Sequence, residues 1–529
     1  MGRSAVLEFV LTHHSATLCL LAALLGASPS YAESTTSEAE PAPIEPSLEL
    51  ALHALPPGIR TPIPEEKPTL AVEYTVDAAL EAQVRAILAK SHLGLAQVVV
   101  LDPATGEVFA YVASDPLEFP ATRAYPMASL MKVVTAAAVL REKPAAVRRS
   151  CRYLGSPYEF DAAQLAVPRT GGRLESFDDS LAISNNQCFG RLAVRDVGRA
   201  ALLAEIERVG LLTPPAFGHS AGSFDPVENS LALGRLGSGL AGSSLSPLAA
   251  ARLAAVLAHG ELVEPHWIAG VRDTSGALIA VPEFAAPRRV WEPEVAVSLR
   301  RSLRGVTERG TARRAFRDAK GKPLLGDIAV AGKTGTLQGE NPNGLYQWFV
   351  GVAPAEDPRI AIATLVVHEQ GASRHRGGAG TNASHVAAQT LHGMLCDREG
   401  CATDRIDPLF ARASARRAES VAELEAQRTA REQARMAAER VEPPRLLESS
   451  DIEFPRALRR RQVEGEIVLA VSLAPSGEIA NIRVQESNVS KRFDEPVTEA
   501  VRGWRFAPST RGGQPVAGEV RLRIPIQIR

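Results

Sequence analysis

The chain has 529 residues, of which 45% are hydrophobic, and its 59 basic and 60 acidic residues give a formal net charge of −1. This length allows two to four domains with sizeable cores, and the near-zero charge gives no reason to expect nucleic acid or an anionic surface as a partner. Lysines are scarce beside arginines, so a lysine inside an apolar segment is unusually informative.

The N-terminal residues have the composition of an export signal. Arg3 is the only Lys or Arg before an apolar stretch at 16–25, and a small-x-small site (SYA) ends at residue 32. The apolar stretch is too short for a stable membrane anchor. An uncleaved anchor is the alternative, because Glu8 and two histidines weaken the basic n-region. We therefore expect a signal peptide over 1–32 and a periplasmic protein, membrane-associated if the segment is not cleaved.

The next two regions differ sharply in composition. Residues 33–68 are rich in Pro, Glu, Ser and Thr, which predicts an extended linker. Residues 69–402 are expected to form one mixed α/β domain. Apolar residues recur at helical spacing over 76–90, and LAQVVVLDPATGEVFAYVAS then reads as two strands joined by a Pro-Ala-Thr-Gly turn. Later strand candidates are DIAVAG, QWFVGVAP and IAIATLVVHE.

The C-terminal part divides into a spacer and a small domain. A charged linker at 403–446 contains a run rich in Ala, Arg and Glu with few apolar positions, which predicts a solvated helix. Residues 447–529 are expected to form a separate α+β domain. Alternate residues are apolar at 467–473 and 520–528, a period typical of half-buried strands, and a helical segment lies between them.

Four cysteines follow the expected signal, an even number that permits disulfides in an exported protein. Cys396 and Cys401 could close a small loop, and Cys151 could pair with Cys188. Four free, buried thiols are an equally good interpretation. Neither spacing resembles a zinc site, because no pair of histidines accompanies it.

The segment YPMASLMKVVTAAAVL places a serine and a lysine three residues apart where an apolar helix begins. Ser129 is then expected in the first turn, with Lys132 on the same face and within side-chain reach. Unpaired N–H groups at a helix start add a positive potential that favours a nucleophile. On the order of one S-x-x-K is expected by chance in a chain of this length. This motif alone therefore leaves open a core helix with an incidental lysine.

Two further motifs narrow the interpretation. Ser184 and Asn186, in SLAISNNQCFGRLA, offer a hydroxyl and an amide, although alone they would be read as a helix N-cap. The segment GKTGT, which starts at Gly332, follows a strand-like run with a cation, a hydroxyl and a glycine that lets a substrate approach the backbone. A phosphate-binding loop is excluded, because that motif needs a glycine where Asp327 stands.

The motifs S-x-x-K, S-x-N and K-T-G, in this order, form the signature shared by penicillin-binding proteins and serine β-lactamases. Residues 70–395 resemble the penicillin-binding transpeptidase domain, with VTERGTA, VAGKTGT and WFVGVAP in family order. The resemblance implies an α/β (α+β) fold, a five-stranded antiparallel sheet flanked by helices beside an all-helical lobe. It also implies a serine D,D-transpeptidase or D,D-carboxypeptidase that acts on D-Ala-D-Ala stem peptides of peptidoglycan, with β-lactam antibiotics as covalent inhibitors and no cofactor.

The resemblance assigns catalytic roles to Ser129, Lys132, Ser184, Asn186 and Lys333. Ser129 would attack the substrate carbonyl and form an acyl-enzyme. Lys132 would be the general base, provided that burial and Lys333 lower its pKa well below about 10.4. Ser184 would relay a proton to the leaving amine, and Asn186 would hydrogen-bond Lys132 and the substrate backbone.

Substrate binding is assigned to Thr334, Gly335 and Thr336. Lys333 and Thr334 would hold the substrate carboxylate. The backbone N–H groups of Ser129 and Thr336 would form an oxyanion hole worth about 3 kcal/mol per donor.

The last domain resembles the TonB C-terminal domain in FPRALRRRQVEGEIVLAVSLAPSGEIANIRV and AVRGWRFAPSTRGGQPV. This resemblance implies a small helix-backed sheet whose edges can pair with partner peptides. Energy transducers have a membrane helix and a long Pro-rich stalk, which are not expected here, so docking to a protein or to the wall is the preferred interpretation. Glycan polymerisation is not expected either, because only a linker separates the expected signal from the catalytic domain.

The catalytic domain has two alternative functions, that of a β-lactamase and that of an adaptor without turnover. A β-lactamase needs an activated water for deacylation, and no Glu stands in a convincing loop context to provide it. A wall-binding or penicillin-sensing adaptor would keep the fold without turnover, and the intact set of three motifs speaks against it.

Overall fold

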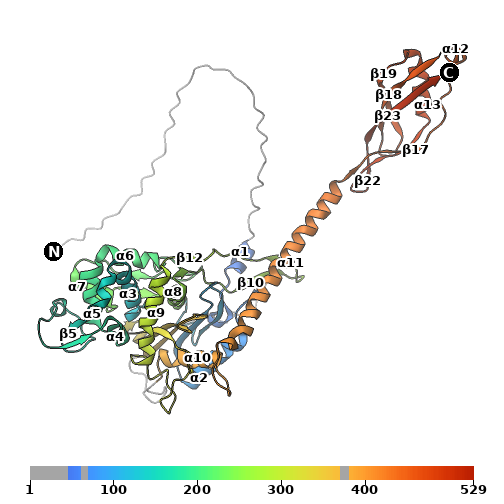
Figure 1. The fold of residues 1–529 in the computed structure, drawn as a ribbon. Coiled ribbons are helices and arrows are strands. Elements are labelled where there is room, and N and C mark those ends of the chain that lie inside the picture. The colour runs from blue at the N-terminus through green and yellow to red at the C-terminus, as the bar shows by residue number, and fades with distance from the viewer. Residues whose placement is uncertain (1–45, 61–69, 370–380, 461, 529) are drawn as a thin grey trace, which may run out of the picture. The chain divides into compact units, whose positions relative to one another are not determined.

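The structure is a computed structural model that describes residues 46–60, 70–369, 381–460 and 462–528 (Figure 1). The expected signal peptide lies outside the described residues. Among the helices that the structure describes, none is both long enough and apolar enough to cross a membrane.

A five-stranded antiparallel sheet lies at the centre of the catalytic domain, in the order β13-β14-β15-β2-β3. The expected hairpin forms β2 and β3, and their side chains are buried throughout, in agreement with their continuous apolar sequence. The later candidates are also strands, but DIAVAG joins the sheet only from Ala331 onward. The five strands are β2 (Leu95–Leu101), β3 (Val108–Ala113), β13 (Ala331–Glu340), β14 (Asn343–Ala353) and β15 (Ile360–Glu369).

Helices cover both faces of this sheet (Figure 1). α2 (Ala78–Lys90) and α10 (Ala383–Leu395) pack on one face, and α8 (Pro247–His259) and α9 (Pro293–Glu308) pack on the other. Local signals delimit α8: the Ser246 side chain caps its start, a proline occupies the first position, and Gly260 ends it with a φ of 72°. The expected five-stranded sheet between helices is therefore confirmed.

The lobe beside the sheet is helical except for a few short strands. Its strand pair β5 (Cys151–Tyr153) and β6 (Arg173–Glu175) departs from the expected all-helical lobe. The helices of the lobe are α3 (Met131–Glu142), α4 (Phe177–Ala182), α5 (Asn186–Leu192), α6 (Arg199–Arg208) and α7 (Ser230–Ser238).

The expectation of an extended linker is wrong for residues 46–60. This stretch contains α1 (Pro46–Leu52) and a short 3-10 helix (Pro57–Ile59). The Trp267 indole donates a hydrogen bond to the Ala54 carbonyl at 2.7 Å. Ala51 and Ile59 are buried in the main core. A few apolar residues are thus enough to pack a Pro-rich segment against the domain.

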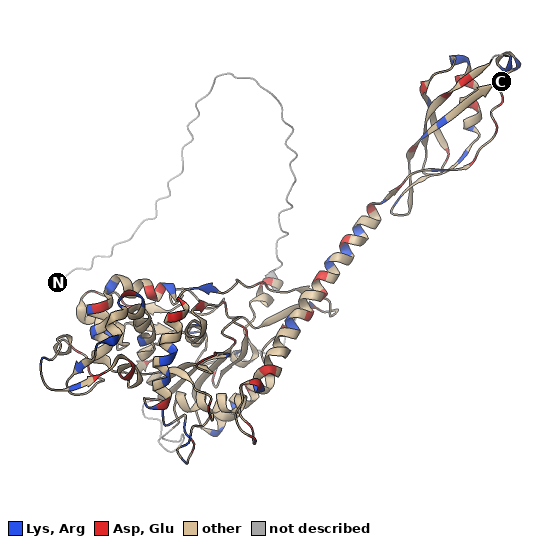
Figure 2. Ribbon diagram, in the orientation of Figure 1, with Lys and Arg blue, Asp and Glu red and all other residues tan. Residues whose placement is uncertain are grey.

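The charged linker forms one helix, α11 (Asp407–Glu439), whose first half is not a free spacer. Arg412 pairs with Asp77 at 2.7 Å, and Glu423 pairs with Arg272 at 2.8 Å. From residue 428 onward every side chain of the helix is exposed, and basic and acidic residues are interspersed along it (Figure 2). The prediction of a solvated spacer therefore describes only the second half of this helix.

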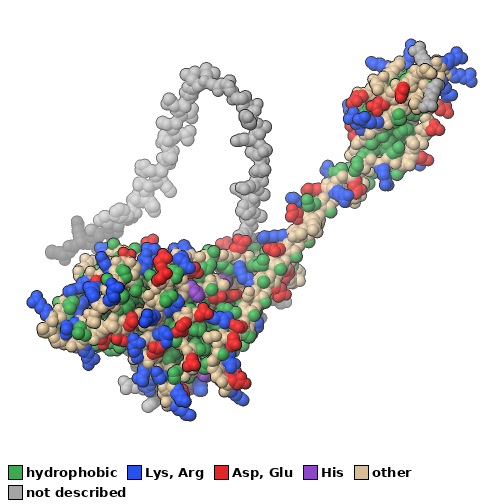
Figure 3. Space-filling view, viewed as in Figure 1, with side chains coloured by type: hydrophobic (Ala, Val, Ile, Leu, Met, Phe, Trp, Pro, Cys, Tyr) green, Lys and Arg blue, Asp and Glu red, His purple; other side chains and the backbone are tan. Residues whose placement is uncertain are grey.

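The C-terminal domain has the expected strands and helix. A three-stranded antiparallel sheet in the order β19-β18-β23 buries apolar side chains with one helix, whose Val497 and Val501 are fully buried. The elements are β18 (Val463–Leu473), β19 (Ile479–Ser487), α13 (Asp494–Arg502) and β23 (Gly518–Ile528). On the face of this C-terminal domain that Figure 3 shows, both charged and hydrophobic side chains reach the surface, and the charges are of both signs.

Candidate active site

Ser129 lies on a short 3-10 helix (Ala128–Leu130) that leads directly into α3. Lys132 follows in the first turn of α3 and is fully buried. Its Nζ lies 2.8 Å from Ser129 Oγ, 2.7 Å from Asn186 Oδ1 and 2.5 Å from the Ser238 carbonyl. The amine of Lys132 is thus held by three acceptors, one of which is the Ser129 hydroxyl. This arrangement excludes the interpretation of Lys132 as an incidental lysine in a core helix.

Close packing holds the turn before Ser129 in an unusual conformation. Ala128 has a φ of 53°, in the left-handed region that residues with a side chain rarely adopt. A Cβ at Gly239 would stand 2.0 Å from the Ala128 carbonyl oxygen, and a Cβ at Gly335 would stand 3.1 Å from Ala128 Cβ. Both glycines therefore let neighbouring segments pack against the turn that presents the serine.

In the S-x-N motif, it is the middle residue that caps the helix. The Asn185 side chain accepts a hydrogen bond from the Cys188 N–H at 3.1 Å and caps α5. Ser184, whose φ is 61°, and Asn186 are thereby left free for the site. Asn186 accepts from Lys132 through Oδ1 and donates through Nδ2 to the Tyr158 carbonyl at 2.5 Å. Hydrogen bonds therefore fix both the oxygen and the nitrogen of the Asn186 side-chain amide.

The KTG motif enters the site on strand β13 rather than on a loop before a helix, in agreement with the exclusion of a phosphate-binding loop. Lys333 is fully buried, and its Nζ donates to Ser184 Oγ at 2.9 Å and to the Thr334 carbonyl at 2.8 Å. The Thr334 hydroxyl lies 2.5 Å from that of Thr311. Each lysine of the site therefore contacts one of the two serines.

Burial sets the protonation of both lysines. It lowers the pKa of Lys132 well below its ordinary value, and the positive charge of Lys333 lowers it further. Burial also lowers the pKa of Lys333 to about 7. A neutral Lys132 can take a proton across its 2.8 Å contact with Ser129, because the hydroxyl then donates and the amine accepts.

A cavity of about 410 Å³ lies beside these groups. Its lining includes six of the eight predicted residues: Ser129, Ser184, Asn186, Thr334, Gly335 and Thr336. Lys132 and Lys333 are not among the lining residues, and they reach the cavity through the serines to which they are bonded. The structure therefore brings all eight predicted residues together around one cavity.

The other nine lining residues were not predicted as site residues from the sequence: Tyr158, Gly239, Leu240, Thr311, Gln347, Trp348, Asn382, Ala383 and Ser384. Thr311 stands in VTERGTA, a segment that resembled the family but suggested no role for this residue. Tyr158 belongs to the loop between β5 and β6, where nothing in the local pattern indicates a site. Gln347 is part of strand β14, and the apolar run around it predicted the strand rather than a polar contact.

Comparison with known families agrees with this geometry. The sequence profile of the penicillin binding protein transpeptidase domain matches residues 96–392, and that of the Gram-negative bacterial TonB protein C-terminal domain matches residues 450–526. The chain belongs to the penicillin-binding-protein transpeptidase family and carries a TonB-type C-terminal domain.

Individual relatives match one part of the chain or the other. The chain is 27% identical over 338 residues to the peptidoglycan D,D-transpeptidase PbpA of Mycobacterium tuberculosis, a match that covers 56% of this chain and 66% of PbpA, slightly less than two thirds. It is also 36% identical over 73 residues to the protein TonB of Xanthomonas campestris. This match covers 14% of this chain and 32% of TonB. The crystal structure of PBPA from Mycobacterium tuberculosis, 24% identical, covers 61% of this chain and 81% of that chain with a TM-score of 0.50, which shows a shared fold.

Proposed function

We propose that the protein is a serine acyl-transfer enzyme that acts on D-Ala-D-Ala stem peptides of peptidoglycan as a D,D-transpeptidase. The observation that carries this proposal is the 2.8 Å contact between Ser129 Oγ, at a cavity, and the Nζ of a fully buried lysine. The names of the mycobacterial relatives, peptidoglycan D,D-transpeptidases, support the same reaction class.

In the first half-reaction, Lys132 accepts the Ser129 proton as the hydroxyl oxygen bonds to the carbonyl carbon of the penultimate D-Ala. The N–H groups of Ser129 and Thr336 stabilise the resulting oxyanion. The C–N bond to the terminal D-Ala then breaks. Ser184 passes its hydroxyl proton to the leaving amine and takes a proton from the Lys333 ammonium across their 2.9 Å contact. Ser129 is left as an ester of the stem peptide, and Lys132 keeps the proton that it took from Ser129.

Lys333 suits this proton transfer. Its Nζ donates to Ser184 Oγ, so the hydroxyl hydrogen of Ser184 remains available to a second acceptor such as the leaving amine. Its charge disfavours protonation of Lys132. At the edge of the cavity, the Thr334 hydroxyl and Thr336 can bind the substrate carboxylate and backbone.

In the second half-reaction an amine of a neighbouring stem peptide attacks the ester and loses a proton through Ser184 to Lys333. Lys132 returns its proton to Ser129 Oγ as the ester C–O bond breaks, which releases Ser129 and completes the crosslink. Water in place of the amine would make the protein a D,D-carboxypeptidase, the nearest alternative. A β-lactamase is disfavoured, because none of the cavity-lining residues that the structure describes is a carboxylate able to activate a deacylating water. We expect penicillin adducts to be long-lived.

We also propose that the protein works in the periplasm, where an oxidising environment supports its two disulfides, Cys151–Cys188 and Cys396–Cys401. The TonB-type domain would dock a protein or wall partner. Its edge strands β19 and β23 each pair on one side only within their three-stranded sheet, and an extended peptide can add to such an edge.

Labelling with a fluorescent penicillin, followed by intact-protein mass spectrometry, tests the enzymatic proposal. We expect one penicillin per chain, attached to Ser129 and stable for many minutes, and no adduct on a Ser129→Ala variant. An adduct on that variant, or release within seconds, would contradict the proposal. Stem peptides offered with and without an acceptor amine then separate the transpeptidase from the carboxypeptidase.

A further inference from the structure

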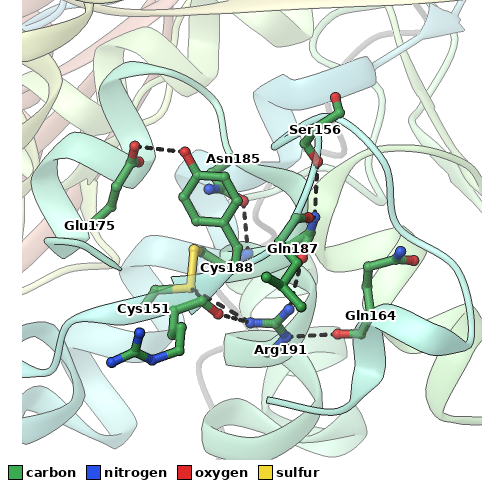
Figure 4. The surroundings of a disulfide bond; sticks show 11 residues. Cys151, Ser156, Gln164, Glu175, Asn185, Gln187, Cys188 and Arg191 are labelled. Carbon is green, nitrogen blue, oxygen red and sulfur yellow. Dashed lines mark hydrogen bonds between the residues drawn. A yellow bond between two sulfur atoms is a disulfide. The ribbon is translucent and has the colours of Figure 1, made fainter. Parts of the chain in front are cut away.

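The loop between β5 and β6 is fixed to the helix that carries Asn186. Cys151, on β5, forms a disulfide with the buried Cys188 of α5, with a Cα–Cα distance of 5.8 Å. Figure 4 shows Gln187 and Arg191 of the same helix beside this bond. We call residues 154–164, the part of the loop next to the disulfide, the roof segment, since its Tyr158 lines the catalytic cavity.

Two polar side chains of α5 hold the roof segment through its backbone carbonyls. Gln187 donates to the carbonyls of Leu154 and Ser156 at 2.7 and 2.9 Å. The buried Arg191 donates to the Gln164 carbonyl at 2.7 Å and to the carbonyl of Arg152, just before the segment, at 2.5 Å (Figure 4). The disulfide closes this network at the start of the loop.

The same segment holds Asn186. The Asn186 N–H donates to the Pro157 carbonyl at 2.7 Å, and its Nδ2 donates to the Tyr158 carbonyl. An amide has a donor and an acceptor on opposite sides, so the Tyr158 carbonyl selects the orientation in which Oδ1 faces Lys132. If the roof segment moved away, the amide could turn and present a donor to Lys132, and water could reach the lysine.

We propose that the Cys151–Cys188 disulfide positions Asn186 for catalysis: it fixes the roof segment, whose carbonyls orient the Asn186 amide toward Lys132. The cysteines do not touch the reacting atoms, so they are positioning residues. This inference rests on the proposed acyl-serine function. In reduction by an added phosphine, the phosphine supplies two electrons, and water supplies two protons to the thiols and the oxygen of the phosphine oxide. Since this releases the roof segment and removes no catalytic group, we expect it to lower the acylation rate.

The test compares two disulfide variants of the full chain. Cys151→Ala/Cys188→Ala removes the proposed positioning bond, and Cys396→Ala/Cys401→Ala is a matched control that removes the bond closing a loop of sequence separation 5. The readout is the second-order rate constant of acylation by a fluorescent penicillin between pH 5 and 9. We expect a loss of about tenfold or more in the first variant and a change of less than twofold in the control.

The pH profile separates positioning from a general structural effect. Lys132 is surrounded by the neutral acceptors Ser129, Asn186 and Ser238 and by the charged Lys333. Water admitted beside Lys132 reduces the burial that lowers its pKa, so the acid limb of the profile should move to higher pH. An unchanged rate, or a lower rate with an unchanged acid limb, overturns the proposal.

Reduction of the folded protein keeps the test valid if the first variant does not fold. In the Cys396→Ala/Cys401→Ala background, a phosphine reductant acts on Cys151–Cys188 as the one disulfide left among the described residues. We expect the rate to fall on reduction and to recover on reoxidation, and a rate insensitive to reduction overturns the proposal. If the untreated protein is not acylated at all, it is the proposed function that fails.

Discussion

Replacing Asn186 by Asp tests whether the reaction depends on a neutral lysine. The substitution changes the shape of the side chain very little and places a carboxylate 2.7 Å from Lys132 Nζ. Two unit charges at that separation attract by about 6 kcal/mol at an effective dielectric constant of about 20. This attraction opposes the burial that lowers the pKa of Lys132 and moves that pKa back toward the ordinary value of a lysine, about 10.4.

At pH 7 an amine with the ordinary lysine pKa of about 10.4 is neutral in about one molecule of 2,500, which sets the largest loss that the substitution can cause. We therefore expect Asn186→Asp to lower the acylation rate at pH 7 by more than tenfold and by up to about three orders of magnitude. The loss should shrink as the pH rises toward 10, because the neutral fraction of the amine recovers. The assay is the rate of labelling by a fluorescent penicillin between pH 6 and 10.

A matched control is Asn229→Asp. Asn229 is exposed and caps α7 by accepting a hydrogen bond from the Ala232 N–H at 2.9 Å, a role that Asp fills equally well. Its acylation rate should equal that of the wild type. A wild-type rate in Asn186→Asp at pH 7, or a loss that is the same at every pH, would refute the role assigned to a neutral Lys132.

Three further substitutions probe the rest of the site. Lys333→Met should abolish acylation but raise the free energy of unfolding near pH 7 by at least about 1 kcal/mol. The reason is that burial lowers the pKa of Lys333 to about 7 in the folded state, and such a group destabilises the fold at pH values below its unfolded pKa. Denaturant titration measures this change. Ser184→Ala should lower the acylation rate about 100-fold, since it removes the proton relay. It should also lower the free energy of unfolding by about 1–3 kcal/mol, because it removes a hydrogen-bond acceptor of the fully buried Lys333. Gly239→Ala would place a Cβ 2.0 Å from the Ala128 carbonyl oxygen and should lower the free energy of unfolding by about 1–3 kcal/mol, clearly more than Gly218→Ala, whose φ is also positive but whose Cβ would meet no atom within 4 Å.

The eight site residues could be predicted because their chemistry depends on side chains at fixed spacing. Ser129 and Lys132 share a helical face, and the family signature linked them to motifs that are distant in the sequence. Their partners among backbone carbonyls could not be predicted. The carbonyl of Ser238 holds Lys132 and that of Tyr158 holds Asn186. Because any residue supplies a carbonyl, such contacts leave no trace in the sequence.

In the fold, too, the sequence pattern predicted some elements, whereas tertiary contacts determine others that could not be predicted. Periodicity and apolar runs predicted the individual strands, and the family resemblance predicted that five of them form one antiparallel sheet. The two short helices in residues 46–60 were missed because the residues that they contribute to the hydrophobic core, Ala51 and Ile59, are few and stand among prolines and acidic residues. The pairings Cys151–Cys188 and Cys396–Cys401 are confirmed. Cysteine spacing alone had left free thiols as an equal alternative.

Titration of Lys132 by NMR tests the central claim most directly. The chain has eight lysines, so lysine labelled with ¹³C at Cε gives few signals, and a Lys132→Met variant identifies the one of interest. We predict that burial and the charge of Lys333 hold the pKa of Lys132 well below those of the exposed lysines in the unmodified protein. A Lys132 signal that stays protonated above pH 9 would contradict the claim that this amine activates Ser129.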